Sequence, residues 1–272
     1  MSIFKVALRK ADTLQRRIRR QLYQRRHPCE RTTPVFIVGS QRSGTSMTLR
    51  VFDLSLDALV FNTQDPRAYE RGMLHDPPVI QGLLRGSRAT VTVFKPMHEI
   101  QRIPRFLQKY DGLKIVWPVR HYADVVNSAS RMWPNFLQTV RAMTHEPENA
   151  GWHGESLTEH QRDVLREHFR DDTTLLTANA LFWYVRNSFY FELGLEDAPQ
   201  VRLFSYERMV QKPREQFAEI FDFCGCPFTP ELTREIFDSS IGKNARPEID
   251  PAVDELCQGL LERLSPLAGV PG

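Results

Sequence analysis

Apolar residues occur in short runs through the middle of this chain, and longer stretches with helical periodicity separate the runs. The runs lie at 35–38, 91–94, 115–117 and 201–204 and are rich in β-branched and aromatic residues, which is typical of buried parallel strands. Helices are expected at about 44–56, 98–110, 121–132, 174–193, 213–224, 229–238 and 250–264. This alternation predicts an α/β fold, a three-layer P-loop-like domain with a central parallel sheet of about five strands.

The first 31 residues follow a different pattern. Apolar residues recur there at nearly helical spacing among many basic ones, which predicts a basic amphipathic helix or arm in front of a domain spanning 32–272. Two interpretations stay open: the helix packs on the domain, or it lies on an anionic membrane surface. The stretch 134–172 is rich in His, Glu and Arg and is expected to be an insertion on the domain.

Charge is distributed unevenly along the 272 residues. Residues 1–31 hold ten Lys/Arg against Asp12 and Glu30, which is +8, so the other residues carry −5 of the overall +3. Nucleic-acid binding by the body of the protein is therefore not implied. Four cysteines are too few for a disulfide framework, and no signal peptide or apolar run of about 18 residues is visible. We expect a cytoplasmic protein, with peripheral membrane contact through residues 1–31 as an open alternative.

The segment 39–46, Gly-Ser-Gln-Arg-Ser-Gly-Thr-Ser, follows the first predicted strand and leads into a helix. Such a turn gathers backbone N–H groups around one point, and the helix dipole favours an anion there. The spacing is that of a Walker A loop, but Thr45 stands in the place of its lysine, which weakens an ATP-dependent interpretation. The candidate anion-binding residues are Gln41, Arg42, Ser43, Gly44, Thr45 and Ser46.

A second candidate segment follows the predicted strand at 115–117. Arg120 lies at the strand end and Ser128 eight residues later, within the predicted helix. A guanidinium is a planar fork suited to a phosphate, and a serine hydroxyl can add a further hydrogen bond.

These two segments resemble the nucleotide-binding signatures of the sulfotransferases that use 3′-phosphoadenosine 5′-phosphosulfate (PAPS). The first resembles the family's 5′-phosphosulfate loop. The second resembles its 3′-phosphate segment, although His121-Tyr122 stand where Asp-Pro is usual. The resemblance implies a P-loop-like fold, PAPS as the donor, adenosine 3′,5′-bisphosphate as the product and no metal ion.

Two further matches extend the resemblance to about residues 34–246. Tyr206 follows the last predicted strand, in a segment that resembles the family's Tyr-Glu motif, and the resemblance places it near the adenine. The segment 239–246 resembles the C-terminal basic loop that closes over the nucleotide. Lys243 and Arg246 are its candidate ligands.

The residues after the strand at 91–94 are candidates for the transfer step. Lys95 and His98 resemble the family's lysine–histidine segment, with a spacing that differs by one residue. The resemblance implies that Lys95 assists the bridging oxygen and that His98 is the general base. Asp65 and Glu70 are alternative bases, because several carbohydrate and protein-tyrosine sulfotransferases place a carboxylate after the first crossover helix.

The sequence thus predicts sulfuryl transfer from PAPS to an acceptor hydroxyl, with a glycan or glycolipid favoured by the style of the loop and by the polar insertion, which we expect on the acceptor side. A Mg²⁺-dependent P-loop nucleotide or small-molecule kinase and a non-catalytic nucleotide-binding scaffold are the alternatives. The sequence does not determine the oligomeric state.

Overall fold

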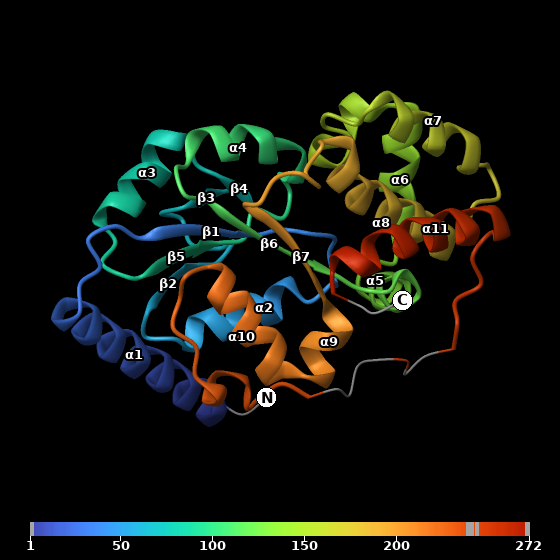
Figure 1. Ribbon diagram of the computed structural model, residues 1–272. Helices are drawn as coiled ribbons and strands as arrows, with labels where there is room; N and C mark the ends of the chain where they lie inside the picture. The colour runs from blue at the N-terminus through green and yellow to red at the C-terminus, as the bar shows by residue number, and fades with distance from the viewer. Residues whose placement is uncertain (1–2, 238–241, 243–244, 270–272) are drawn as a thin grey trace.

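The fold is seen in a computed structural model that describes residues 3–237, 242 and 245–269, with side chains from residue 15 onward. A central sheet of five parallel strands has the order β2-β5-β1-β6-β7 (Figure 1). The strands are β1 (Thr33–Ile37), β2 (Ala58–Phe61), β5 (Val91–Phe94), β6 (Lys114–Val119) and β7 (Val201–Ser205). The predicted α/β class and parallel sheet are confirmed.

Both faces of the sheet are covered, because alternate residues of each strand enter different hydrophobic clusters. In β1, Val35 and Ile37 belong to one cluster and Phe36 to the other. The first cluster includes residues of α2 (Thr45–Leu54), α9 (Tyr206–Gln211) and α10 (Pro213–Phe223). The second includes residues of α3 (Pro77–Gly86), α4 (Ile103–Lys109), α5 (Tyr122–Met132), α8 (Leu175–Glu192) and α11 (Pro251–Leu267). The domain therefore has three layers, as predicted.

Several elements differ from the sequence predictions. The edge strand β2 was not predicted. The helix expected at 98–110 is a short 3₁₀ segment, Ile100–Arg102, followed by α4, because Pro104 has no N–H to continue an α-helix through this point. In place of the helix expected at 229–238 there is the 3₁₀ turn Pro230–Thr233, and residue 238 lies outside the described residues.

Two segments that lie beside the candidate site have their own small elements. A hairpin of β3 (Tyr69–Glu70) and β4 (Met73–Leu74) follows β2. The polar stretch 134–172 folds into α6 (Phe136–His145), the 3₁₀ turns Pro147–Asn149 and Gly151–His153, and α7 (Glu159–His168). Its α6 packs on α8, which attaches it to the domain.

The helix α1 (Ile3–Arg26) runs along one edge of the domain (Figure 1). Its polar residues hold it there: Arg20 pairs with Asp53 at 2.9 Å, and Gln24 donates to the Leu56 carbonyl at 2.8 Å. Ile18 and Leu22 are each 50% exposed. This amphipathic helix therefore turns part of its polar side toward the domain and apolar side chains toward solvent. None of the helices among the described residues has the length and apolarity needed to cross a bilayer.

Candidate active site

Several of the predicted site residues come together at one edge of the sheet because they follow strand ends. The loop 38–44 follows β1, Lys95 follows β5, Arg120 follows β6 and Tyr206 follows β7. The carboxyl ends of parallel strands share an edge, and ligands of open α/β sheets bind there.

The loop after β1 turns tightly into α2. Arg42 and Gly44 have left-handed backbone conformations, with φ of 70° and 94°, and the Ser40 and Ser43 hydroxyls are 2.6 Å apart inside the turn. Gly44 is the N-cap and supplies no side-chain acceptor to the first N–H groups of α2. These donors have no partner within the helix either, so the loop suits an anion such as a phosphate.

Close packing fixes the shape of this loop. A Cβ atom on Gly44 would lie 2.5 Å from Cδ2 of the Tyr206 ring. Another neighbour of this ring is Arg120, whose guanidinium carbon lies 4.3 Å from the ring centroid. Tyr206 is buried between the two, so it supports the loop and the guanidinium together.

The two predicted nucleotide segments are in direct contact. Arg42 Nε donates to Ser128 Oγ at 2.8 Å, and Arg120 Nη1 donates to the Arg42 carbonyl at 3.2 Å. Asp124 lies 3.4 Å from Arg120 Nη2 and fixes the other side of the fork. The sequence predicted these residues as one site, and the structure brings them together.

The C-terminal segment reaches the same helix, α5. The Ala245 carbonyl accepts from Asn127 Nδ2 at 3.0 Å, and Arg246 Nη2 pairs with Asp254 at 2.6 Å. Arg246 also donates to the Tyr122 hydroxyl at 3.3 Å. Arg246 therefore lies beside the helix that carries Ser128, while Lys243 lies outside the described residues.

Lys95 lies over the start of α2. Its Nζ donates to Ser46 Oγ at 2.9 Å, and burial lowers the pKa of its ammonium group. The Tyr69 hydroxyl, from the β3–β4 hairpin, accepts from the Lys95 backbone N–H at 2.6 Å. A lysine and a loop serine are thereby placed at the point where the loop would present a transferable group.

His98 stands three residues further on and lies against the polar insertion. Its ring stacks on Trp152, with centroids 4.2 Å apart and planes 14° apart. Burial lowers the His98 pKa, and the charges of Arg186 and Lys95 lower it further. The imidazole is therefore neutral near pH 7 and can accept a proton.

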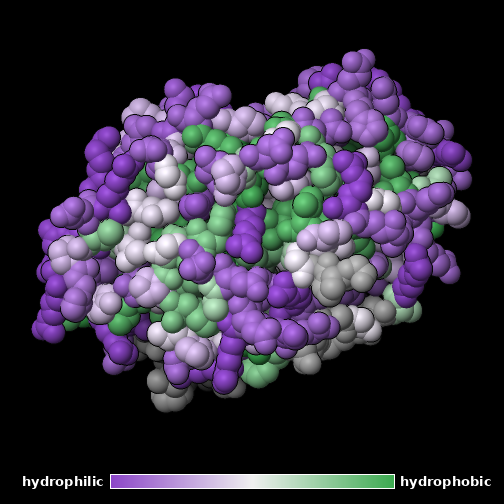
Figure 2. Space-filling model, in the orientation of Figure 1, coloured by the Kyte–Doolittle hydropathy of each residue, from purple (hydrophilic) through white to green (hydrophobic). Residues whose placement is uncertain are grey.

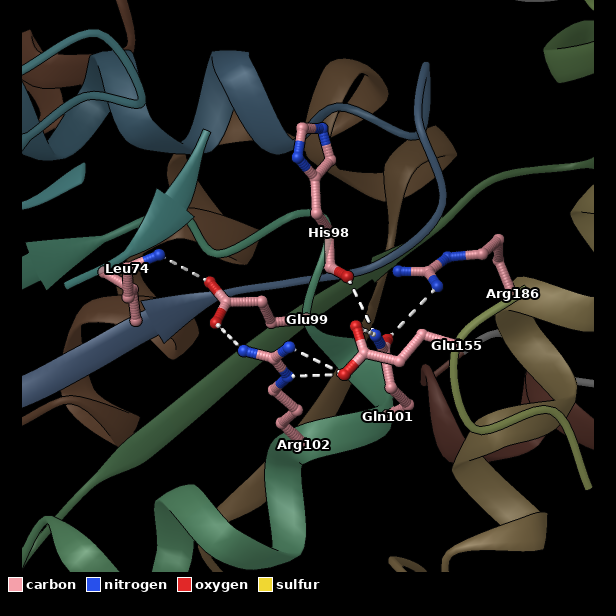
Figure 3. Close-up of polar contacts among 7 residues, drawn as sticks. All are labelled: Leu74, His98, Glu99, Gln101, Arg102, Glu155 and Arg186. Atoms are coloured by element: carbon pink, nitrogen blue, oxygen red, sulfur yellow. Dashed lines mark hydrogen bonds and ion pairs between the residues drawn. The ribbon is translucent and has the colours of Figure 1, made fainter. Parts of the chain in front are cut away.

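A buried polar network holds the backbone around His98 (Figure 3). The ring points away from this network, while the His98 carbonyl accepts from Gln101 Nε2 at 3.1 Å. Arg186, from α8, is 1% exposed and donates to the Met97 carbonyl at 2.8 Å. Burial lowers the Arg186 pKa to about 9. Sequence patterns gave no sign of Arg186, because it is an isolated arginine within an apolar helix.

The two carboxylate candidates have different surroundings. Asp65 accepts two hydrogen bonds from the Arg67 guanidinium, at 2.9 and 2.6 Å, and these lower its pKa. Glu70 is exposed on the β3–β4 hairpin. The structure thus places Asp65 in an ion pair and Glu70 at the surface.

A cavity of about 300 Å³ opens between His98 and the loop after β1. Its walls are mostly apolar, and α5, α6 and α8 supply most of them. Gln41 lines it near the loop, and its buried Oε1 has no hydrogen-bond partner among the described residues. The aromatic side chains of the cavity are Trp133, Phe136, Trp152, Phe182 and Trp183. No short sequence motif reveals this cavity, because its residues come from separate helices and loops.

Fold and loop together define a P-loop-like α/β domain with an anion-binding loop after β1. The sulfotransferase domain family matches residues 32–248, and the chain belongs to this family. It is a sulfotransferase, and PAPS is the donor that this family uses. This membership argues against the kinase alternative.

Solved structures share the fold at low sequence identity. They include the sulfotransferase domain from the Synechococcus PCC 7002 olefin synthase, with 15% identity, coverage of 85% of this chain and 95% of that one, and a TM-score of 0.51. The sulfotransferase domain from the curacin biosynthetic pathway has 14% identity, coverage of 87% of this chain and 99% of that one, and a TM-score of 0.53. A sulfotransferase from Alicyclobacillus acidocaldarius has 16% identity, coverage of 88% of this chain and 97% of that one, and a TM-score of 0.52. A comparison with curated protein sequences finds no significant match.

Proposed function

We propose that this chain transfers the sulfuryl group of PAPS to a hydroxyl of a glycan or glycolipid. The observation that carries the donor assignment is the 2.8 Å hydrogen bond between Arg42 and Ser128. It joins the anion-binding loop to the Arg120 segment, so that two phosphate-type sites lie side by side. PAPS carries phosphate groups at both its 5′ and 3′ ends, which suits two such sites.

On this proposal the loop after β1 binds the 5′ end of the donor. The first N–H groups of α2 and the Arg42 guanidinium hold its charged oxygens. Arg120 and Ser128 hold the 3′-phosphate, with Arg246 and Lys243 closing from the C-terminal segment. Tyr206 keeps the loop and Arg120 in place beside the adenosine.

The transfer step needs two groups near the sulfur atom. The bond from sulfur to the bridging phosphate oxygen breaks while a bond to the acceptor oxygen forms, and the acceptor loses a proton. Lys95 is positioned by Ser46 to stabilise charge on the bridging oxygen. We assign the proton to His98, because its imidazole is neutral, whereas the Asp65 carboxylate is held by Arg67.

The acceptor enters the aromatic cavity beside His98. Aromatic faces such as those of Trp152 and Phe136 can stack on the apolar faces of a sugar ring or on the lipid portion of a glycolipid. The insertion 134–172 supplies part of this wall, which supports its role on the acceptor side. The outward-facing Ile18 and Leu22 of α1, among many arginines, suit peripheral contact with an anionic membrane where a glycolipid would lie.

The test is transfer of radiolabelled sulfuryl from PAPS to a panel of glycans, glycolipids and phenols, in the presence of a metal chelator. We expect label in a glycan or glycolipid, and a loss of about 10²–10⁴-fold in turnover for His98→Ala with little change in donor binding. Label only in phenols would contradict the acceptor class. Donor binding with no transfer to any acceptor would favour the non-catalytic scaffold.

A further inference from the structure

A second cavity, of about 380 Å³, lies between α1, the start of α2 and the end of β2. Its walls carry five arginines and two carboxylates, Asp53 and Asp65. Glu235 lies 3.6 Å from Arg50, so the arginines exceed these three carboxylates by two positive charges. The arginines are Arg16, Arg17, Arg20, Arg50 and Arg67.

Both carboxylates are already paired within the protein. Asp53 accepts from Arg20 at 2.9 Å, and Asp65 is held by Arg67 through two hydrogen bonds. Arg20 is only 8% exposed, and its buried Nε has no hydrogen-bond partner among the described residues. A desolvated guanidinium is costly to bury, and a negative charge in the cavity would offset part of this cost through its charge, without contacting the buried N–H.

This cavity adjoins the proposed transfer site. Ser46 lines its wall, and the same hydroxyl accepts from Lys95 Nζ at 2.9 Å. The cavity wall also includes Asn62, which follows β2 at the sheet edge where the site residues gather. An acceptor whose hydroxyl reacts at the transfer site can therefore extend a charged group past Lys95 toward the arginines.

We infer that the arginine cavity binds an anionic group of the acceptor: a carboxylate, a phosphate ester or a sulfate ester on a sugar. The inference rests on the proposed function and narrows its substrate class to acidic glycans or glycolipids. Guanidinium groups bind such planar or tetrahedral oxyanions through two hydrogen bonds at once, and the volume suits one charged sugar unit. At the end of the molecule where α1 runs, hydrophilic residues predominate, with some hydrophobic ones among them (Figure 2).

The experiment is a calorimetric titration of the full chain, saturated with adenosine 3′,5′-bisphosphate so that the donor site is filled. Glucose 6-phosphate and glucose are the two probes. We expect glucose 6-phosphate to bind at least about tenfold more tightly than glucose. Arg17→Glu should remove most of this preference. Arg19→Glu is the matched control, because Arg19 lies on the same helix but lines a different, shallow groove.

Three results would overturn the inference. Equal affinity for the two sugars would show that the cavity has no anion site. An equal loss of the glucose 6-phosphate preference in the two variants would show that the positive charge of the whole helix attracts the sugar, and not this cavity. If phosphatidylserine vesicles bind through both Arg17 and Arg19 while glucose 6-phosphate shows no saturable binding, the positive charges of α1 bind a membrane surface and not the acceptor. Failure of adenosine 3′,5′-bisphosphate to bind would defeat the proposed function and the inference with it, whereas the three results above defeat the inference alone.

Discussion

Replacing Arg186 should change the pH dependence of catalysis without touching the donor site. Its guanidinium carbon lies 5.2 Å from the Trp152 ring, and that ring stacks 4.2 Å from His98, so the charge and the imidazole are separated by about 9 Å at most. At an effective dielectric constant of about 20 this separation corresponds to an electrostatic repulsion of about 2 kcal/mol between the guanidinium and a protonated imidazole. The groups that face His98 are Lys95, which also lowers its pKa, and His153, which is itself neutral.

The Arg186 charge determines the direction in which the pH dependence moves. Arg186 lowers the His98 pKa, so Arg186→Met should raise it, and a higher pH is then needed to form the neutral base. The acid limb of kcat/KM, measured with labelled PAPS from about pH 5 to about pH 8, should move to higher pH. His98→Ala should abolish the limb, which identifies it as belonging to His98.

Arg186→Lys is the control, because it keeps the charge and alters the hydrogen bond to the Met97 carbonyl. Its limb should stay in place, although kcat should fall through loss of the 2.8 Å contact. Circular dichroism would verify the fold of each variant. An unchanged limb in a folded Arg186→Met protein would refute the electrostatic role.

The remaining predictions concern the loop, acid stability and the helix α1. At Gly44 the backbone φ is 94° and an added Cβ would lie 2.5 Å from Tyr206, so Gly44→Ala should weaken the binding of adenosine 3′,5′-bisphosphate at least about tenfold. Gly112 has a φ of 71° but open space around it, so Gly112→Ala should leave this binding unchanged. Equal effects of the two changes in calorimetry would contradict this prediction. Burial lowers the His153 pKa from 6.5 to about 4, so between these pH values the unfolded chain binds more protons than the folded protein. The urea midpoint of unfolding should therefore fall as the pH is lowered through this range, and it should fall less in His153→Gln. Changing Ile18 and Leu22 to Ser should weaken binding to phosphatidylserine vesicles in flotation assays without changing Tm, because both are half exposed; a large drop in Tm would show that they pack on the domain.

Sequence patterns predicted the elements that carry strong local signals. The apolar runs of β1, β5 and β6 are buried on both faces, and that of β7 is buried except for Arg202, so their composition marks them as strands of a parallel sheet. The short edge strand β2 carries a weaker signal, since only Ala58 and Phe61 of its residues are buried. The interruption of the helix expected at 98–110 has a local signal in Pro104, which lacks a backbone N–H.

The donor side of the site was predictable because its residues lie in two short segments, 39–46 and 120–128, which a resemblance can match. On the acceptor side the sequence predicted His98 and the insertion 134–172 but not the aromatic cavity, since the residues of the cavity are spread across separate helices. The partner of His98 in stacking, Trp152, lies 54 positions away in a polar insertion. Arg186 and the arginine cavity depend on packing between elements, and packing of this kind leaves no short motif in the sequence.

The central claim is that two phosphate sites lie side by side at the end of the sheet. A calorimetric comparison of adenosine 3′,5′-bisphosphate with AMP, in the presence of a metal chelator, tests it most directly. We predict that the bisphosphate binds at least about a hundredfold more tightly, because AMP leaves Arg120 and Ser128 without a phosphate. We also predict that Ser128→Ala narrows the difference. Equal affinities for the two nucleotides would contradict the assignment of the Arg120 segment to the 3′-phosphate.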